Sequence, residues 1–283
     1  MNQSVIRAAV WDFFKKMRPR VLHAGKHSGK IGKNFGRTGE KTMRDYKTEF
    51  ENRVAFIRRK IDEAHADGII YGNSGGKDCT LVGILCKAAC DNTVGLIMPC
   101  ASSRNFGIDR DDALTVAERY GIETRTIDLT AVRAAETERL AGITKLTDAA
   151  LANIAPRLRM TTLYAVGASE NRLVAGTGNR SEAYMGYFTK WGDGAYDFNA
   201  IADLTVTEIY EFLRYLDAPR CILDKAPSAG LFEGQTDEQE MGVTYRAIDA
   251  VLLGGETTDA ERATIERYHA RAGHKLRMPD TFV

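Results

Sequence analysis

Short apolar runs alternate with longer amphipathic stretches along most of this chain. The runs have the length and composition of buried strands, at 69–71, 93–98, 122–129 and 172–177. Apolar residues recur at helical spacing around them, at 42–66, 81–90, 109–120 and 157–168. Because strands that alternate with helices favour parallel pairing, we expect an α/β fold, a doubly wound and mostly parallel sheet with helices on both faces.

Local signals predict where some of these helices begin and end. Asp109 is expected to cap a helix that Gly121 ends. Pro156 is expected to occupy the first turn of the helix over 157–168, since proline is well tolerated there. Residues 130–155 are expected to be helical or irregular.

The C-terminal part of the chain combines helices with two polar, glycine-containing stretches. The stretches at 178–199 and 223–237 are expected to be loops, and loops of this length inside a compact domain are usually functional. The helices are expected at 204–216, 239–253 and 260–272.

A glycine-rich segment, YGNSGGKDCT over 71–80, joins the first predicted strand to a buried helix. Glycines at such a junction let the backbone approach a phosphate, and the helix N-terminus adds free N–H groups and partial positive charge. Only three residues separate Gly72 from Gly76, and Asp78 follows Lys77, so this is not a Walker A loop. The dinucleotide pattern G-x-G-x-x-G is also absent.

Residues 74–79 read S-G-G-K-D-C, which resembles the pyrophosphate loop of the ATP pyrophosphatase group. Members of that group split ATP into AMP and pyrophosphate, and the Asp of their loop holds a magnesium ion. The resemblance therefore implies ATP as a substrate and a metal-binding role for Asp78.

Composition places the chain among cytoplasmic globular proteins. Its 283 residues suffice for one large domain, and no run of about 18 apolar residues predicts a membrane span. No secretory signal is evident at the N-terminus. The five cysteines form no C-x-x-C pair, which is typical of reduced thiols, and Cys86 and Cys90 are best explained as core residues.

Charge is distributed unevenly along the chain. Residues 1–50 carry a net charge of +8, and the remainder carries about −7 because the whole chain is +1. We therefore expect a basic, flexible N-terminal arm over 1–40 and a single catalytic domain over 41–283. Nucleic-acid binding by the arm is not favoured, since no nucleic-acid-binding module accompanies it.

Four later segments resemble motifs of one enzyme family. Together with the phosphate loop, and in this order, they closely resemble ammonia-dependent NAD synthetase over roughly residues 50–283. Asp237 and His274-Lys275 follow at suitable places. The four segments are 156–160, PRLRM; 176–182, GTGNRSE; 186–197, GYFTKWGDGAYD; and 225–229, KAPSA.

The resemblance implies an amidation reaction in two steps. ATP adenylates the nicotinate carboxylate of deamido-NAD and releases pyrophosphate, and ammonia then displaces AMP to give NAD. A carboxylate is a poor acyl donor, whereas its adenylate has a good leaving group. Because two polyanions must meet, the site needs metal and cationic side chains.

The resemblance also implies roles for individual residues. Asp78 and Glu182 would hold Mg²⁺, and Asp78, Lys77 and Lys190 would serve catalysis. The residues implied to contact ATP are Gly72, Ser74, Gly75, Gly76, Lys77, Asp78, Cys79, Thr177 and Ser228. Those implied to contact deamido-NAD are Arg157, Lys190, Asp197, His274 and Lys275. Each also has an ordinary structural explanation, such as a tight turn, a helix cap or a surface ion pair.

Three positions depart from the usual family pattern. Cys79 stands where the family usually has Ser, so a weaker thiol donor replaces a hydroxyl. Lys77 stands where many members have an apolar or amide residue. Val206 stands where many members have an ATP-contacting Lys, and we hypothesise that Lys77 offsets this loss. In that case Lys77→Ala raises the KM for ATP strongly.

The remaining expectations concern partners and competing functions. No glutaminase domain is evident, so ammonia is expected from solution or from a separate protein. A homodimer is expected, and the loops near 100–108 and 225–237 are candidate lids. Three alternatives are open: adenylation of a different carboxylic acid, tRNA thiolation or lysidine formation, and RNA binding by a non-catalytic protein with a basic arm.

Overall fold

A computed structural model describes residues 44–101, 106–225 and 236–282. Its centre is a four-stranded parallel sheet in the order β3-β2-β1-β4, which confirms the predicted α/β fold. The two central strands are almost entirely buried, whereas β3 is a polar edge strand. The strands are β1 (Gly68–Gly72), β2 (Thr93–Ile97), β3 (Glu123–Thr126) and β4 (Arg172–Ala175).

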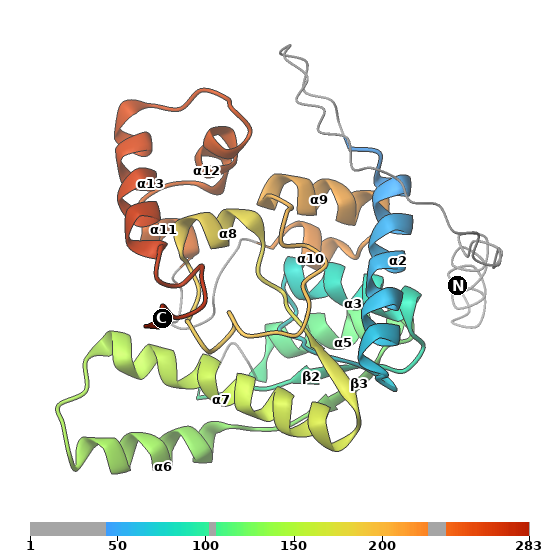
Figure 1. Cartoon of the computed structure of the whole chain (residues 1–283), viewed down its shortest axis with the longest axis horizontal. Helices are drawn as coiled ribbons and strands as arrows, with labels where there is room; N and C mark the ends of the chain where they lie inside the picture. The colour runs from blue at the N-terminus through green and yellow to red at the C-terminus, as the bar shows by residue number, and fades with distance from the viewer. Residues whose placement is uncertain (1–43, 102–105, 226–235, 283) are drawn as a thin grey trace.

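Helices cover both faces of this sheet (Figure 1). One face packs against α3 (Lys77–Ala89) and α5 (Ile108–Tyr120), with α2 (Tyr46–Ala64) outside α3. The other face packs against α7 (Asp148–Ser169), which forms an antiparallel hairpin with α6 (Thr130–Ala141).

Successive side chains of β1 pack into different apolar clusters, one on each face of the sheet. Ile69 and Tyr71 belong to the larger apolar cluster with α3, whereas Ile70 faces the cluster that includes Leu163 of α7. Successive strand residues point to opposite faces, so a strand buried on both faces needs an uninterrupted apolar run. This explains why the short run at 69–71 was sufficient to predict the strand.

The C-terminal helices form a further layer next to the sheet (Figure 1). Most of them build their own apolar cluster, whereas the two over 206–215 and 220–223 pack mainly on α3 as part of the larger cluster. Met185, Val206, Met241 and Ile248 are buried in the C-terminal apolar cluster. The helices are α8 (Arg180–Met185), α9 (Val206–Tyr215), α10 (Arg220–Leu223), α11 (Asp237–Met241), α12 (Tyr245–Leu252) and α13 (Asp259–Ala272).

Two predictions about helix starts are wrong. Pro156 lies inside α7 rather than in its first turn, because Thr147 caps the helix and accepts a hydrogen bond from the Ala150 N–H at 3.2 Å. Asp109 does not cap α5: the N-cap is Gly107, and Asp109 is buried in the first turn. At α7, the capping signal of Thr147 thus outweighs the preference of proline for the first turn of a helix.

The predicted C-terminal elements also need correction. The expected loop 178–199 contains α8, whose six residues are too few to show helical periodicity. The expected helix 239–253 is two helices, α11 and α12, because Gly242 adopts the left-handed conformation with φ +70° and ends the first.

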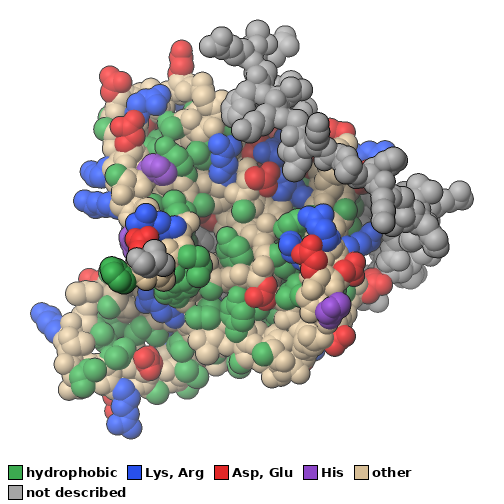
Figure 2. Space-filling model, viewed as in Figure 1, with side chains coloured by type: hydrophobic (Ala, Val, Ile, Leu, Met, Phe, Trp, Pro, Cys, Tyr) green, Lys and Arg blue, Asp and Glu red, His purple; other side chains and the backbone are tan. Residues whose placement is uncertain are grey.

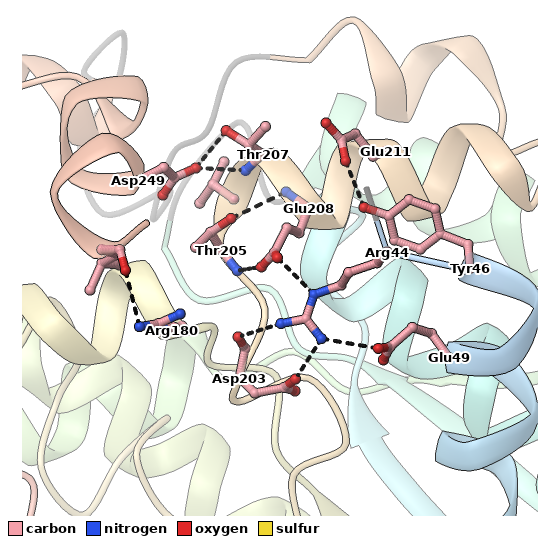
Figure 3. A network of polar contacts seen from close by, with 12 residues as sticks. Arg44, Tyr46, Glu49, Arg180, Asp203, Thr205, Thr207, Glu208, Glu211 and Asp249 are labelled. Atoms are coloured by element: carbon pink, nitrogen blue, oxygen red, sulfur yellow. Dashed lines mark hydrogen bonds and ion pairs between the residues drawn. The ribbon is translucent and has the colours of Figure 1, made fainter. Parts of the chain in front are cut away.

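A network of ion pairs fastens α2 to the segment that leads into α9 (Figure 3). The Arg44 Nε donates to Glu208 Oε1 at 2.7 Å, and Arg53 pairs with Asp203 Oδ1 at 2.6 Å and with Glu49 Oε2 at 2.7 Å. Arg53 is buried and also donates to the Ala200 carbonyl. The network fixes residues 200–208, which follow the bridge between Ala175 and Phe198.

The Tyr71 hydroxyl yields a prediction about stability. This oxygen is fully buried and has no hydrogen-bond partner among the described residues. Tyr71→Phe should therefore raise the free energy of unfolding by about 1 kcal/mol, because it removes an unpaired polar atom. Urea unfolding measures this change. Tyr120→Phe is the matched control and should lower stability, since the Tyr120 hydroxyl donates to the Leu216 carbonyl at 3.1 Å. Destabilisation by Tyr71→Phe would contradict the prediction.

Within the part of the chain that the structure describes, no helix has both the length and the apolar character needed to cross a membrane.

Candidate active site

A cavity of about 610 Å³ opens at the carboxyl ends of the parallel strands. Residues that follow β1, β2 and β4 line it, as is usual for ligand sites in open α/β sheets. Leu163 of α7 and Lys275 also line it. Figure 2 shows hydrophobic side chains gathered in this region, between the α6–α7 hairpin and the C-terminal helices.

The glycine-rich loop has the backbone geometry of an anion-binding turn. Gly75 adopts φ +69°, and a Cβ at this position would clash with the Asp109 carbonyl oxygen. Gly76 is the N-cap of α3 and has no side-chain cap. The N-terminus of α3 therefore offers free N–H groups beside the cavity, which its first residues line.

Cys79 is part of the loop's internal hydrogen-bonding. Its Sγ lies 3.2 Å from the Gly76 N–H and 3.3 Å from Ser74 Oγ. Burial raises the pKa of the Cys79 thiol, so the side chain stays neutral. The thiol thus fills the position of the expected serine and keeps the loop compact.

Two carboxylates and one ammonium meet beside this loop. The Lys77 Nζ lies 2.7 Å from Asp78 Oδ2 and 3.9 Å from Glu182 Oε1, and 6% of the Lys77 side chain is exposed. Asn179 holds both acids: its Nδ2 donates to Asp78 Oδ1 at 3.1 Å, and its backbone N–H donates to Glu182 Oε2 at 3.1 Å. Residues of two distant segments, the phosphate loop and the start of α8, thus form one polar cluster.

The pKa shifts in this cluster show that its two acidic side chains favour a neighbouring positive charge. Burial and the charge of Asp78 together raise the pKa of Glu182 to about 8. Burial alone would lower the pKa of Lys77, but the carboxylates of Asp78 and Glu182 raise it above the ordinary value. The carboxylates are close enough to share one cation.

The donor set suits a hard divalent ion such as Mg²⁺. Magnesium typically uses one or two carboxylates together with water and substrate phosphates, rather than a cage of protein ligands. The described residues contain no group of three or more His, Cys, Asp or Glu arranged to hold a metal. The pair Asp78 and Glu182 therefore fits an ion that substrate phosphates would help to bind.

The residues expected to bind deamido-NAD do not all line the cavity. Lys275 does, whereas Arg157, Lys190 and His274 form a group beside it. The Lys190 Nζ donates to the His274 carbonyl at 2.5 Å, and the Arg157 guanidinium donates to the Lys190 carbonyl at 3.4 Å. Asp197 lies apart from this group, against β4, where it accepts from the Val174 N–H at 2.7 Å.

The structure places the predicted ATP-contacting residues in two groups. Gly72, Ser74, Gly76, Lys77, Asp78, Cys79 and Thr177 line the cavity, and Gly75 lies between lining residues. Ser228 lies outside the described residues, as do 102–105 of the first candidate lid and 226–235 of the second. Val206 is buried in the C-terminal apolar cluster and does not line the cavity.

The Lys275 ammonium organises the loop that follows α8. It donates to the Gly186 and Phe188 carbonyls, both at 2.8 Å. Lys275→Met should lower the free energy of unfolding by about 1–2 kcal/mol, because two carbonyls lose a charged donor. Urea unfolding tests this against Lys145→Met, a change at an exposed lysine. Equal stabilities of the two variants would show that Lys275 does not hold the loop.

Two residues of the site, Asn179 and Lys225, stand in motif segments of the sequence but received no role there. Asn179 carries the capping box of α8, and the signal for it was the spacing between Asn179 and Glu182. Lys225 Nζ lies 2.8 Å from Asp109 Oδ1, 2.7 Å from Asp112 Oδ2 and 3.1 Å from the Gly75 carbonyl. No local signal predicts these contacts, because the partners are more than a hundred residues away.

Comparisons with known proteins agree with this architecture. The family model described as NAD synthase matches residues 49–279. The NH(3)-dependent NAD(+) synthetase of Carboxydothermus hydrogenoformans is 45% identical over 239 residues, which cover 83% of this chain and 97% of the relative.

Two solved structures share the fold over most of their length. The NMN synthetase of Francisella tularensis has a TM-score of 0.79 and 38% identity, covering 84% of this chain and 98% of that one. The NH3-dependent NAD synthetase of Campylobacter jejuni has a TM-score of 0.69 and 29% identity, with coverages of 85% and 100%. The chain described here belongs to the NAD synthase family.

Proposed function

We propose that the chain amidates deamido-NAD with ammonia, at the expense of ATP, to give NAD, AMP and pyrophosphate. One observation carries this proposal: a phosphate loop and the carboxylates of Asp78 and Glu182 share one cavity in a member of the NAD synthase family. The relative from Carboxydothermus hydrogenoformans, named an NH(3)-dependent NAD(+) synthetase, is covered almost completely by this chain. The chain would thus be a ligase that forms a carbon–nitrogen bond.

The reaction would run in two balanced steps. A carboxylate oxygen of the nicotinate group attacks the α-phosphorus of ATP, and the bond to pyrophosphate breaks. Ammonia then attacks the carbonyl carbon, the bond to AMP breaks, and a proton leaves the nitrogen. The oxygen that the carboxyl group loses departs with AMP.

The phosphate loop would bind ATP through its backbone. The free N–H groups at the N-terminus of α3 would receive the phosphates, and Ser74 and Cys79 would maintain the turn. Thr177 and Ser228 would complete the ATP contacts. Mg²⁺ held by Asp78 and Glu182 would neutralise phosphate charge and polarise the phosphorus centre.

The acid substrate would lie toward the Lys190 side of the cavity. Lys190 and Arg157 converge there with His274, and they offer positive charge to a dinucleotide's phosphates. Lys275 would support this wall through its two backbone contacts rather than by direct binding. Asp197 would act on the acid only indirectly, since its Oδ2 accepts from the β4 backbone.

Other aspects of the proposal follow from the family. We propose a homodimer in the cytoplasm that uses free ammonia or ammonia from a separate protein. The alternatives of tRNA thiolation, lysidine formation and RNA binding receive no support from the comparisons. The basic arm over 1–40 lies outside the described residues.

A coupled assay tests the proposal. Purified protein receives ATP, Mg²⁺, ammonium and deamido-NAD, and NAD and AMP are quantified together. Equal amounts of NAD and AMP are expected. Nicotinate mononucleotide serves as a competing acid, because one relative of solved structure is named an NMN synthetase. Preferential amidation of nicotinate mononucleotide would identify this compound, rather than deamido-NAD, as the substrate. If neither acid led to release of AMP, the proposal would be contradicted.

A further inference from the structure

The Lys77 side chain occupies an unusual position for a residue of a phosphate loop. It lies at the first residue of α3 and is nearly fully buried. Its ammonium does not extend into solvent but turns back toward Asp78 Oδ2, at 2.7 Å, and toward Glu182 Oε1, at 3.9 Å. The Tyr245 ring lies 5.5 Å from the Nζ and flanks this position.

The geometry of the carboxylates leaves one oxygen of each for a shared cation. Asp78 Oδ1 and Glu182 Oε2 both accept hydrogen bonds from Asn179. The other oxygens, Asp78 Oδ2 and Glu182 Oε1, are the atoms closest to the Lys77 ammonium. The oxygens that do not accept from Asn179 are therefore the ones that contact a cation, and a divalent ion held by these acids would compete with Lys77 for them.

We propose that the Lys77 ammonium is a built-in cation that occupies the Asp78–Glu182 position in the free protein and that a divalent ion must displace. This inference rests on the proposed metal role of these acids. It assigns Lys77 a positioning role before ATP binds, which goes beyond the ATP contact that the family resemblance implies.

Displacement has a consequence for the order of binding. Two buried acids without a cation would repel each other when charged, so the Lys77 ammonium, within 4 Å of both, holds them close together. A divalent ion arriving alone must compete with a covalently attached ammonium. An ion arriving with ATP brings the phosphate charges, which provide the displaced ammonium with new anionic partners. ATP and metal should therefore bind cooperatively.

Mn²⁺ binding to the full chain without nucleotide tests this inference. Electron paramagnetic resonance of free Mn²⁺ gives the affinity of the wild type, of Lys77→Met and of a matched control, Lys87→Met. Lys87 lies in the last turn of the same helix, and its ammonium donates to the Asp91 carbonyl at 2.8 Å. Lys77→Met should bind Mn²⁺ at least about tenfold more tightly than the wild type, and Lys87→Met should match the wild type.

ATP provides the second part of the test. Saturating ATP should raise the Mn²⁺ affinity of the wild type by a larger factor than that of Lys77→Met. If the wild type and Lys77→Met bound Mn²⁺ equally tightly without nucleotide, the inference would be overturned. The same holds if neither protein bound Mn²⁺. Lys77→Gln, which retains a donor for Asp78 without the charge, replaces Lys77→Met if the latter does not fold.

A measurement on the wild type avoids any effect of substitution. Pulse modification with an amine-reactive reagent, read by mass spectrometry, reports how accessible the Lys77 amine is. Its reactivity should rise several-fold when Mn²⁺ saturates the protein, and unchanged reactivity despite bound Mn²⁺ would overturn the inference. Because neither readout depends on turnover, the NAD assay of the wild type separately decides whether the proposed function holds.

Discussion

The Asp78→Asn variant is expected to lose NAD formation by a factor of about 10³ in kcat/KM while it keeps its fold. The substitution removes one of the two carboxylates proposed to hold Mg²⁺ against the phosphates of ATP. It also leaves the Lys77 ammonium with Glu182 as its only acidic partner in this cluster. The negative charge that develops at the α-phosphate in the transition state would then be stabilised less by the bound cation.

The fold should survive because Asn is nearly the same size as Asp. The side chain of Asn can still accept a hydrogen bond from Asn179 Nδ2, the contact that Asp78 Oδ1 makes at 3.1 Å. Steady-state kinetics and urea unfolding are measured together, with Asp111→Asn as the control. Asp111 is an exposed acid in the first turn of α5. Activity within tenfold of the wild type in Asp78→Asn would contradict the proposed role of this residue.

The Asp249→Ala variant is expected to lose about 3 kcal/mol of stability. Asp249 is 3% exposed and joins three helices of the C-terminal layer. Its Oδ2 accepts from the Thr207 N–H at 2.7 Å and from Thr207 Oγ1 at 2.6 Å, and its Oδ1 accepts from Ser181 Oγ at 2.5 Å (Figure 3 shows the contacts with Thr207). Alanine would leave these donors buried and unpaired.

This loss should also affect the active site. Ser181 precedes Glu182 in α8, so release of Ser181 loosens the helix that positions the carboxylate. The free energy of unfolding in urea is the measurement, and Asp62→Ala on α2 is the control because Asp62 is exposed. Asp62→Ala should stay within about 0.5 kcal/mol of the wild type. A similarly small loss for Asp249→Ala would show that Asp249 is not needed to join the helices.

The sheet and the phosphate loop could be predicted from the sequence because their signals are local. A strand buried on both faces requires a continuous apolar run, as at 69–71, and the turn after it requires glycine at a position with φ +69°. The short helices α8 and α10 could not be predicted from periodicity, because six and four residues give too little pattern. The capping signals of Thr147 and Asn179 were more informative than hydrophobicity.

The geometry of the candidate site could be predicted only in part. The resemblance to a family named Asp78 and Glu182, but it did not predict that Lys77 would lie between them or that Asn179 would hold both. It named Lys275, which lines the cavity, as a ligand-binding residue, but it did not predict that the Lys275 ammonium donates to two backbone carbonyls. Such partners depend on how distant segments pack, and no local pattern records them.

Transfer of an oxygen isotope tests the central claim most directly. Deamido-NAD labelled with ¹⁸O in the nicotinate carboxylate is converted by the wild-type protein with ATP, Mg²⁺ and ammonium, and the AMP is analysed by mass spectrometry. Adenylation of the carboxylate predicts one ¹⁸O atom in AMP for each molecule of NAD formed. NAD accompanied by unlabelled AMP would contradict the proposed adenylate.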